Sequence, residues 1–244
     1  MTEIAIIADI HGNYEALESV LEDIRANFPE VKEIYCAGDI VGYGPNPREC
    51  IESIINNPHI SATVKGNHDE YLTKGFINRQ VNPDAAAAID WQIGVIPLEL
   101  RWELSQFPVF IARNDPSFNV EIALVHGSPQ YPLDEYVFPD TEKQERLFDY
   151  MMANNIDVLI LGHTHKPFMR TRFLRDLNKK LLILNPGSVG QPRDRDPRAS
   201  YAVLNVENIE GTIVRVDYDI KIVAGKIKSF GMPESLGNRL FQGV

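Results

Sequence analysis

Five short apolar segments of this chain each end in an aspartate or a histidine with a glycine close by, and this arrangement constrains the fold more than any other feature. Glycine lets the backbone turn sharply at a strand end. If the five ends meet, four histidines, two aspartates and one asparagine surround a common point, with His68 beside them. The segments end in Asp9-Ile-His11-Gly12, Gly38-Asp39, Gly66-Asn67-His68-Asp69, His126-Gly127 and Gly162-His163-Thr-His165.

The first third of the chain alternates short apolar runs with helical patterns. Residues 4–8 are apolar and rich in β-branched residues, which predicts a strand covered on both faces. Residues 33–37 and 61–64 predict a second and a third strand. Asn13 begins one helical pattern and Pro47 another, whose predicted inward side chains are Cys50, Ile51, Ile54 and Ile55. This order predicts parallel strands joined by right-handed crossovers. Ligands bind at the carboxyl ends of strands in such sheets, which is where the polar segments fall.

The rest of the chain predicts further elements around this unit. Residues 70–107 have helical spacing and predict a helical insertion over the sheet edge or the site. Strands are predicted at 109–112, 121–125, 157–161, 168–173, 181–184, 201–206 and 212–220, with a hairpin turn at 114–116 and a helix at 141–154. The tail after Ala224 has little pattern and predicts an arm or a loosely ordered end. We expect a single α/β domain over residues 1–244, with 225–244 as the tail.

Composition excludes several classes of protein. With 244 residues, 44% of them hydrophobic, the chain can bury one substantial core. A formal charge of −10 disfavours a stable nucleic-acid complex, because such binding neutralises phosphates with a basic surface. Cys36 and Cys50 are too few for a disulfide framework. No signal peptide or long apolar stretch occurs, which predicts a cytoplasmic protein without a membrane partner.

The side chains at the strand ends indicate a metal site. Five of the six histidines fall there, and only His59 does not. Carboxylate, amide and imidazole ligands without thiolate suit borderline divalent ions, namely Mn, Fe, Co, Ni or Zn. Seven ligands are too many for one such ion and enough for two, and a carboxylate can bridge a pair. The predicted ligands are Asp9, His11, Asp39, Asn67, His126, His163 and His165.

These five motifs, in this order over residues 9–165, resemble those of the calcineurin-like metallophosphoesterases. The resemblance implies a four-layer α/β/β/α sandwich and a phosphoesterase with two metal ions, for which manganese is the favoured ion in vitro. It implies one ion held by Asp9, His11 and His165, the other by Asn67, His126 and His163, and both by Asp39. It further implies a hydroxide between the ions as nucleophile, His68 as the proton donor to the leaving oxygen, and Asp69 as the residue that orients His68.

The residues themselves support this role for His68. It follows a predicted ligand and can therefore face the substrate, and an imidazole with a pKa near 6.5 is suited to proton donation. The alternatives are an eighth ligand or a structural residue.

The residues that follow the Gly38-Asp39 motif differ from those of two related families, and this difference affects which substrate we expect. Protein Ser/Thr phosphatases and symmetrical diadenosine tetraphosphatases of this superfamily carry an arginine shortly after the Gly-Asp motif, whereas this chain has none at 40–44. The sequence is more similar to the small prokaryotic branch of phosphodiesterases. We therefore expect a phosphodiesterase acting on a small or nucleotide-like ester. The alternatives are a phosphomonoesterase or nucleotidase, a scaffold without catalysis, and a nuclease. Homo-oligomers stay possible.

Two further sets of residues are candidates for substrate contacts. Gly187, Ser188, Arg193 and Arg195 follow a predicted strand and could meet a phosphate, or form a turn with surface ion pairs to Asp194 and Asp196. Tyr43, Tyr131 and Tyr136 could stack on a base or pack within their loops. Lys65 and Lys166 adjoin motifs and are expected to point into solvent.

Overall fold

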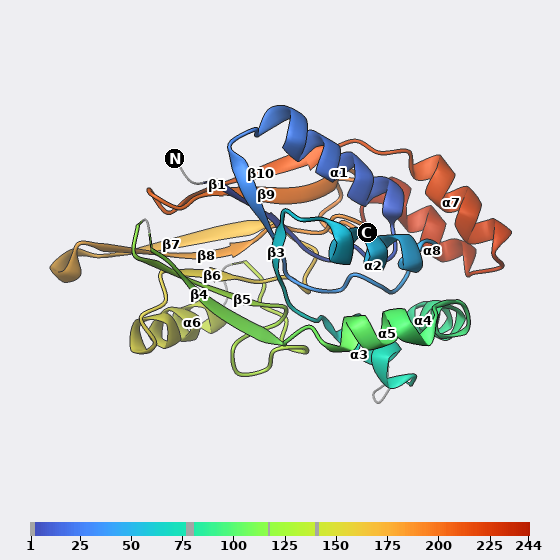
Figure 1. Cartoon of the computed structure of the whole chain (residues 1–244), viewed down its shortest axis with the longest axis horizontal. Coiled ribbons are helices and arrows are strands. Elements are labelled where there is room, and N and C mark those ends of the chain that lie inside the picture. The colour runs from blue at the N-terminus through green and yellow to red at the C-terminus, as the bar shows by residue number, and fades with distance from the viewer. Residues whose placement is uncertain (1–2, 77–80, 117, 140–141) are drawn as a thin grey trace.

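Two five-stranded sheets form the centre of the computed structural model, which describes residues 3–76, 81–116, 118–139 and 142–244 (Figure 1). The first sheet has the order β10-β9-β1-β2-β3 and the second β4-β5-β6-β8-β7. The strands of the first are β10 (Glu210–Val216), β9 (Ala199–Asn205), β1 (Glu3–Ile7), β2 (Val31–Cys36) and β3 (Ile60–Thr63). Those of the second are β4 (Phe110–Asp115), β5 (Val120–Val125), β6 (Val158–Ile160), β8 (Lys179–Asn185) and β7 (Phe168–Leu174).

Helices cover the outer face of each sheet, and the predicted four-layer sandwich is confirmed. α1 (Tyr14–Asn27) and α2 (Pro47–Asn56) pack on the first sheet, and α6 (Glu142–Ala153) packs on the second. α1 starts where predicted, because the Asn13 side chain accepts a hydrogen bond from the Ala16 amide at 3.2 Å. β1–β2 and β2–β3 are parallel, as are β5–β6 and β6–β8.

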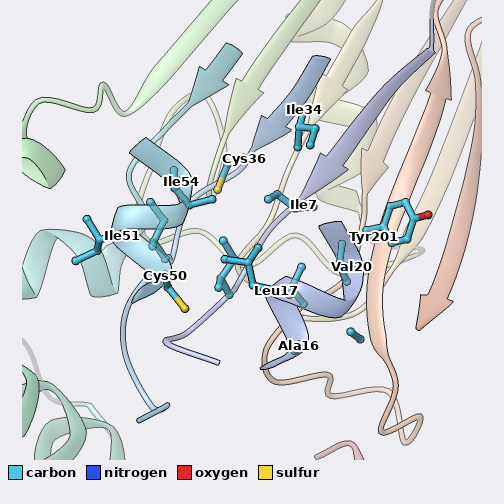
Figure 2. Close-up of a cluster of buried hydrophobic side chains, with 14 of the residues drawn as sticks. Ile7, Ala16, Leu17, Val20, Ile34, Cys36, Cys50, Ile51, Ile54 and Tyr201 are labelled. Carbon is cyan, nitrogen blue, oxygen red and sulfur yellow. The ribbon is translucent and has the colours of Figure 1, made fainter. Parts of the chain in front are cut away.

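β1 shows why a strand at this position is apolar throughout. Ala5 and Ile7 pack into the cluster beneath α1 and α2, which Figure 2 shows together with Leu17, Ile51 and Tyr201. Ile4 and Ile6 point to the opposite face and join the cluster between the two sheets. Because successive side chains of a strand point to opposite faces, both sets must be apolar.

The predicted insertion is helical and lies beside the first sheet. It contains α3 (Asn67–Lys74), α4 (Pro83–Val95) and α5 (Leu98–Ser105) (Figure 1). Leu72, Ile96 and Leu104 are buried in the same cluster as α1 and α2. The part of the insertion at 77–80 lies outside the described residues.

Several local expectations are wrong. Ile55 was expected to face inward but is 37% exposed at the end of α2. The hairpin between β4 and β5 turns after Asp115, because Asn114 and Asp115 still pair with β5. β10 ends at Val216, four residues before the predicted end of that strand, and Ile220 already begins a helix. Lys65 is only 14% exposed and pairs with Glu70 at 3.0 Å.

The expectation of a loosely ordered tail is also wrong. The segment forms α7 (Ile220–Ser229), α8 (Glu234–Asn238) and the 3-10 helix η2 (Arg239–Gln242). Asp219 caps α7 by accepting from the Lys221 and Ile222 amides. Val223 and Ile227 recur at helical spacing, and they pack with Leu236 and Leu240 against Ala88 of α4. This short amphipathic pattern begins within the predicted last strand, which obscured it.

Two further expectations concern membranes and cysteines. Within the described ranges, no helix has both the length and the apolar character required to cross a membrane. Cys36 and Cys50 are free, buried thiols.

Replacing Ile227 with alanine tests whether the C-terminal helices are an integral part of the core. Ile227 is 2% exposed, so its truncation should lower the free energy of unfolding by about 2–4 kcal/mol in urea denaturation. Ile222→Ala is the matched control, because Ile222 lies on the same helix and is 48% exposed. Equal, small effects of both substitutions would contradict this packing.

Candidate active site

The structure brings all seven predicted ligands together at one end of the two sheets. Three overlapping groups of candidate ligands form there: Asp9, His11 and His165; His11, Asp39 and His68; and Asp39, His126 and His163. Within each group the candidate ligand atoms lie within 4.8 Å of one another, so His68 as an eighth ligand stays an alternative. Asn67 joins them through its Oδ1 atom, 3.3 Å from His126 Nε2. All of these side chains are buried.

One group consists of Asp9, His11 and His165. The Nε2 atoms of the two histidines are 3.0 Å apart. Asp9 Oδ1 lies 3.5 Å from His165 Nε2 and 3.9 Å from His11 Nε2. The second oxygen, Asp9 Oδ2, is buried without a hydrogen-bond partner among the described residues.

A second group consists of Asn67, His126 and His163, and Asp39 lies between the two groups. His126 Nε2 is 3.1 Å from His163 Nδ1. Asp39 Oδ2 lies 3.2 Å from His126 Nε2 and 3.6 Å from His11 Nε2. The other oxygen, Asp39 Oδ1, accepts a hydrogen bond from the His68 amide at 2.8 Å. One carboxylate is therefore fixed by the backbone and directed at both groups.

Main-chain carbonyl groups fix the orientation of three of the imidazoles. The Nδ1 atoms of His11, His126 and His165 lie 2.9, 2.8 and 2.6 Å from the carbonyl oxygens of Val41, Ala37 and Gln191. A carbonyl oxygen can only accept, so each Nδ1 carries the proton and each Nε2 offers its lone pair when the ring is neutral. Such contacts set the tautomer of histidines that bind metals.

The backbone at the site is held in an unusual conformation. Five of the seven predicted ligands have positive φ: Asp9 (53°), His11 (51°), Asp39 (54°), His163 (68°) and His165 (57°). Left-handed backbone costs about 1–2 kcal/mol per residue, although aspartate and histidine tolerate it better than bulky residues. The surrounding structure must therefore stabilise these turns, which rarely occur together by chance.

Burial and mutual charge shift the pKa values of these groups strongly. Burial raises the pKa of Asp9 to about 7, despite the opposing charge of His126. Burial lowers the pKa of His11 and of His165 well below the usual value, so both rings are neutral. Burial also disfavours charge on His126 and Asp39, but their attraction dominates, raising the pKa of His126 to about 9 and holding that of Asp39 well below its usual range.

These features fit divalent metal ions. Two neutral imidazoles whose Nε2 lone pairs face each other at 3.0 Å repel unless a cation lies between them. With a metal–nitrogen distance of about 2.0–2.1 Å, two ligands at a right angle on one ion are about 3 Å apart. Asp9 Oδ2, which is buried without a hydrogen-bond partner among the described residues, also indicates a bound cation. The nitrogen and oxygen donors suit borderline divalent ions.

His68 lies at the start of α3, beside the ligands. Its ring packs against Tyr43 and His11, at centroid distances of 4.7 and 4.9 Å. Gly42 makes room for it, because a Cβ atom on this residue would lie 2.4 Å from His68 Nδ1. The orientation of His68 by Asp69 stays a prediction. The contacts of Asp69 are to the backbone, with the Val41 amide at 3.1 Å and the Gly66 amide at 2.9 Å.

The segment after β8 supports the ligand loops. Ser188 Oγ donates to the Asp9 carbonyl oxygen at 2.7 Å and accepts from the Gln191 amide at 2.8 Å. The Gly190 amide donates to the same Asp9 oxygen at 3.0 Å. Both hydrogen bonds of the Ser188 hydroxyl are thus made to the backbone of neighbouring loops, so this side chain supports the structure of the loops.

A cavity of about 360 Å³ opens beside this centre. Its lining includes Asn67 and His68 from the site, Ala85 from the insertion, and Tyr43 and Tyr136. Tyr136 stacks on His163 with a centroid distance of 3.9 Å, whereas Tyr131 is 61% exposed and is not among the lining residues. A larger hollow of about 630 Å³ beside α1 is lined by none of the predicted ligands, so the chemistry identifies the smaller cavity as the site.

Two arginines, Arg193 and Arg239, also line the cavity, and the sequence pattern identified only Arg193 as a candidate. Arg193 lies there, which agrees with one of the two alternatives stated for it, whereas Arg195 is exposed. Asp194 and Asp196 pair with Arg215 and Arg198, rather than with the neighbours proposed. Arg239 of η2 also lines the cavity, although nothing in its sequence surroundings marked it. The amphipathic spacing of α7 could have indicated a packed C-terminal segment, but not the position of Arg239.

A profile described as the calcineurin-like phosphoesterase superfamily domain matches residues 2–209 of the chain. The chain belongs to this superfamily, and this membership supports a hydrolase that acts on phosphate esters. An uncharacterised protein of Methanocaldococcus jannaschii is 40% identical over 98% of both chains. A crystal structure of a metallophosphoesterase from Sphaerobacter thermophilus is 36% identical, covers 99% of this chain and 100% of its own, and has a TM-score of 0.80. A hypothetical protein from Pyrococcus horikoshii is 25% identical, covers 100% and 99%, and has a TM-score of 0.87.

These findings confirm the family and the fold that the motifs predicted. Together with the ligand groups they support divalent metal binding by this phosphoesterase. The individual roles of the nine predicted site residues stay predictions, as does the identity of the ions.

Replacing Gly190 with alanine tests the support of the Asp9 loop. A Cβ atom there would lie 1.8 Å from the Ile10 carbonyl oxygen, so the loop must move, and metal content measured by atomic emission should fall severalfold. Gly225→Ala in α7 is the control, because its Cβ meets nothing within 4 Å. It should raise the free energy of unfolding by about 0.5–1 kcal/mol and leave the metal content unchanged. Normal metal content in the Gly190 variant would refute the proposed support.

Proposed function

We propose that this phosphoesterase holds two divalent transition-metal ions and hydrolyses phosphodiesters of small or nucleotide-like molecules. The observation that carries the proposal is the position of Asp39 Oδ2, 3.6 Å from a nitrogen of one ligand group and 3.2 Å from a nitrogen of the other. A carboxylate oxygen shared in this way suits a bridging ligand between two ions.

In this proposal each group holds one ion. Asp9, His11 and His165 form one site, and Asn67, His126 and His163 form the other, as the family resemblance implies. Two ions held there would supply a nucleophile near neutral pH, by lowering the pKa of bound water, and would neutralise charge on the phosphate. The carbonyl contacts of His11, His126 and His165 keep their Nε2 atoms available as ligands.

His68 is the proposed proton donor to the leaving oxygen. It lines the cavity next to Asn67, and Asp39 accepts a hydrogen bond from its backbone amide. The backbone of His68 is therefore held by the Asp39 carboxylate, while its ring lines the cavity. A general acid of this kind contributes typically about 10²–10⁴-fold to a rate.

The cavity supports a substrate larger than phosphate itself. A diester carries a substituent on each side of its phosphorus, and the volume of about 360 Å³ beside the ligands suits such a molecule. Tyr43 and Tyr136 supply aromatic walls. The second candidate is a phosphomonoesterase, which the two arginines in the lining favour because a monoester carries a second negative charge.

The relative rates on two model substrates test the function. Metal-stripped protein reconstituted with Mn²⁺ should hydrolyse bis-p-nitrophenyl phosphate faster than p-nitrophenyl phosphate. Asp39→Asn should lose metal and about 10²-fold or more in kcat/KM, because the amide lacks the negative charge of the carboxylate whose Oδ2 lies between the two groups. A faster monoester reaction would favour the second candidate, and an Asp39→Asn variant with normal metal content and rate would exclude the bridge.

His68→Ala tests the acid. It should retain its metal ions and lose about 10²–10⁴-fold in kcat on an alkyl ester, whose leaving group needs a proton. The loss should be much smaller on a p-nitrophenyl ester, because p-nitrophenolate leaves without protonation. Equal losses on both esters, or a loss of metal, would show that His68 does not act as the acid.

A further inference from the structure

Two arginines from distant parts of the chain converge at the cavity beside the ligands. Arg193 follows β8 and Arg239 belongs to η2, and both line the cavity with His68. Their guanidinium carbons lie 5.5 and 5.9 Å from the centroid of the same ring, that of Tyr43. The fold therefore brings two positive charges close to one aromatic ring.

Neither guanidinium is neutralised by an Asp or Glu side chain at ion-pair distance within the described ranges. Arg193 donates from Nε and Nη2 to Gln191 Oε1, at 3.3 and 2.9 Å. Arg239 donates from Nε to an oxygen of Val244, the last residue of the sequence, at 2.5 Å. Burial and then the like charge of Arg193 lower the pKa of Arg239. Arg193 thus has no carboxylate partner among the described residues, and a bound anion would stabilise the two adjacent cations.

The two arginines differ in their relation to the ligands. Arg193 adjoins them directly, since its amide donates to the His165 carbonyl oxygen at 3.2 Å. The charge of Arg193 lowers the pKa of Arg239, and the charge of Asp84 raises it. Asp84 lies in the first turn of α4, on the insertion. Arg239 thus extends the positive charge from the ligands toward the insertion.

The C-terminal helices hold Arg239 in place. Its neighbour Leu240 is 4% exposed and packs with Leu236 and Ile227 in the cluster that Tyr43 also contacts. A guanidinium on a packed element loses less freedom on binding than one on an unsupported loop. This favours a built binding position over a chance surface charge.

We propose that Arg239, with Arg193, binds a second anionic group of the substrate next to the scissile phosphate. This proposal rests on the metal-dependent phosphoesterase function above. It assigns the substrate to esters with at least two adjacent phosphates, such as nucleoside polyphosphates or pyrophosphate-linked nucleotides. A guanidinium offers paired donors that match two oxygens of one phosphate, while Tyr43 restricts its orientation.

Inhibition by AMP and ADP tests the second phosphate directly. The assay is bis-p-nitrophenyl phosphate hydrolysis by the Mn²⁺-loaded protein, with free Mn²⁺ held constant. The wild-type ratio Ki(AMP)/Ki(ADP) should exceed about ten, and Arg239→Gln should reduce it about tenfold, as expected for one charge-assisted contact. Arg239→Lys should restore part of the ratio, because it keeps the charge without the fork. Arg195→Gln, an exposed arginine on the same loop as Arg193, should leave it unchanged.

The controls separate this proposal from the function on which it rests. Melting temperature and metal content establish that each variant is folded and loaded. If Arg239→Gln weakens AMP and ADP equally, Arg239 binds the phosphate at the metal ions and the second-phosphate proposal is wrong. An unchanged ratio also overturns it. In both cases hydrolysis by the wild-type protein would leave the phosphoesterase function standing, whereas its absence would refute that function.

Discussion

The carboxylate of Asp39 connects the parts of this site. One oxygen accepts the His68 amide at the start of α3, and the other lies between His11 and His126. Those histidines follow strands of different sheets, β1 and β5. The Asp39 carbonyl oxygen also accepts the His11 amide at 2.9 Å. The site therefore depends on the two sheets being held in a fixed relation, which the apolar cluster between them provides.

The cost of this arrangement explains much of the surrounding structure. Buried carboxylates and imidazoles with left-handed backbone are unfavourable without partners. The fold supplies those partners through main-chain groups: carbonyls for His11, His126 and His165, and amides for Asp39 and Asp69. Gly66 is required for the same reason, because a Cβ atom there would lie 2.0 Å from Asp39 Oδ1.

Most of the fold, and the meeting of the predicted ligands at one place, could be predicted from the sequence because both depend on local patterns. Apolar runs such as residues 4–8 identify buried strands, and the polar residues that follow them meet once the strands pair. The short helix α7 was missed because its amphipathic stretch is brief and follows a β-branched strand. Arg239 could not be found from sequence, since its place at the site depends on how three short helices pack against α4 and Tyr43.

The most direct test of two metal sites sharing Asp39 is a titration of metal-free protein with Mn²⁺, followed by electron paramagnetic resonance. The account predicts that two ions bind per chain and that their spectrum shows spin coupling, because ions joined by one carboxylate lie about 3.5–4 Å apart. Binding of a single ion, or of two ions with uncoupled spectra, would contradict it.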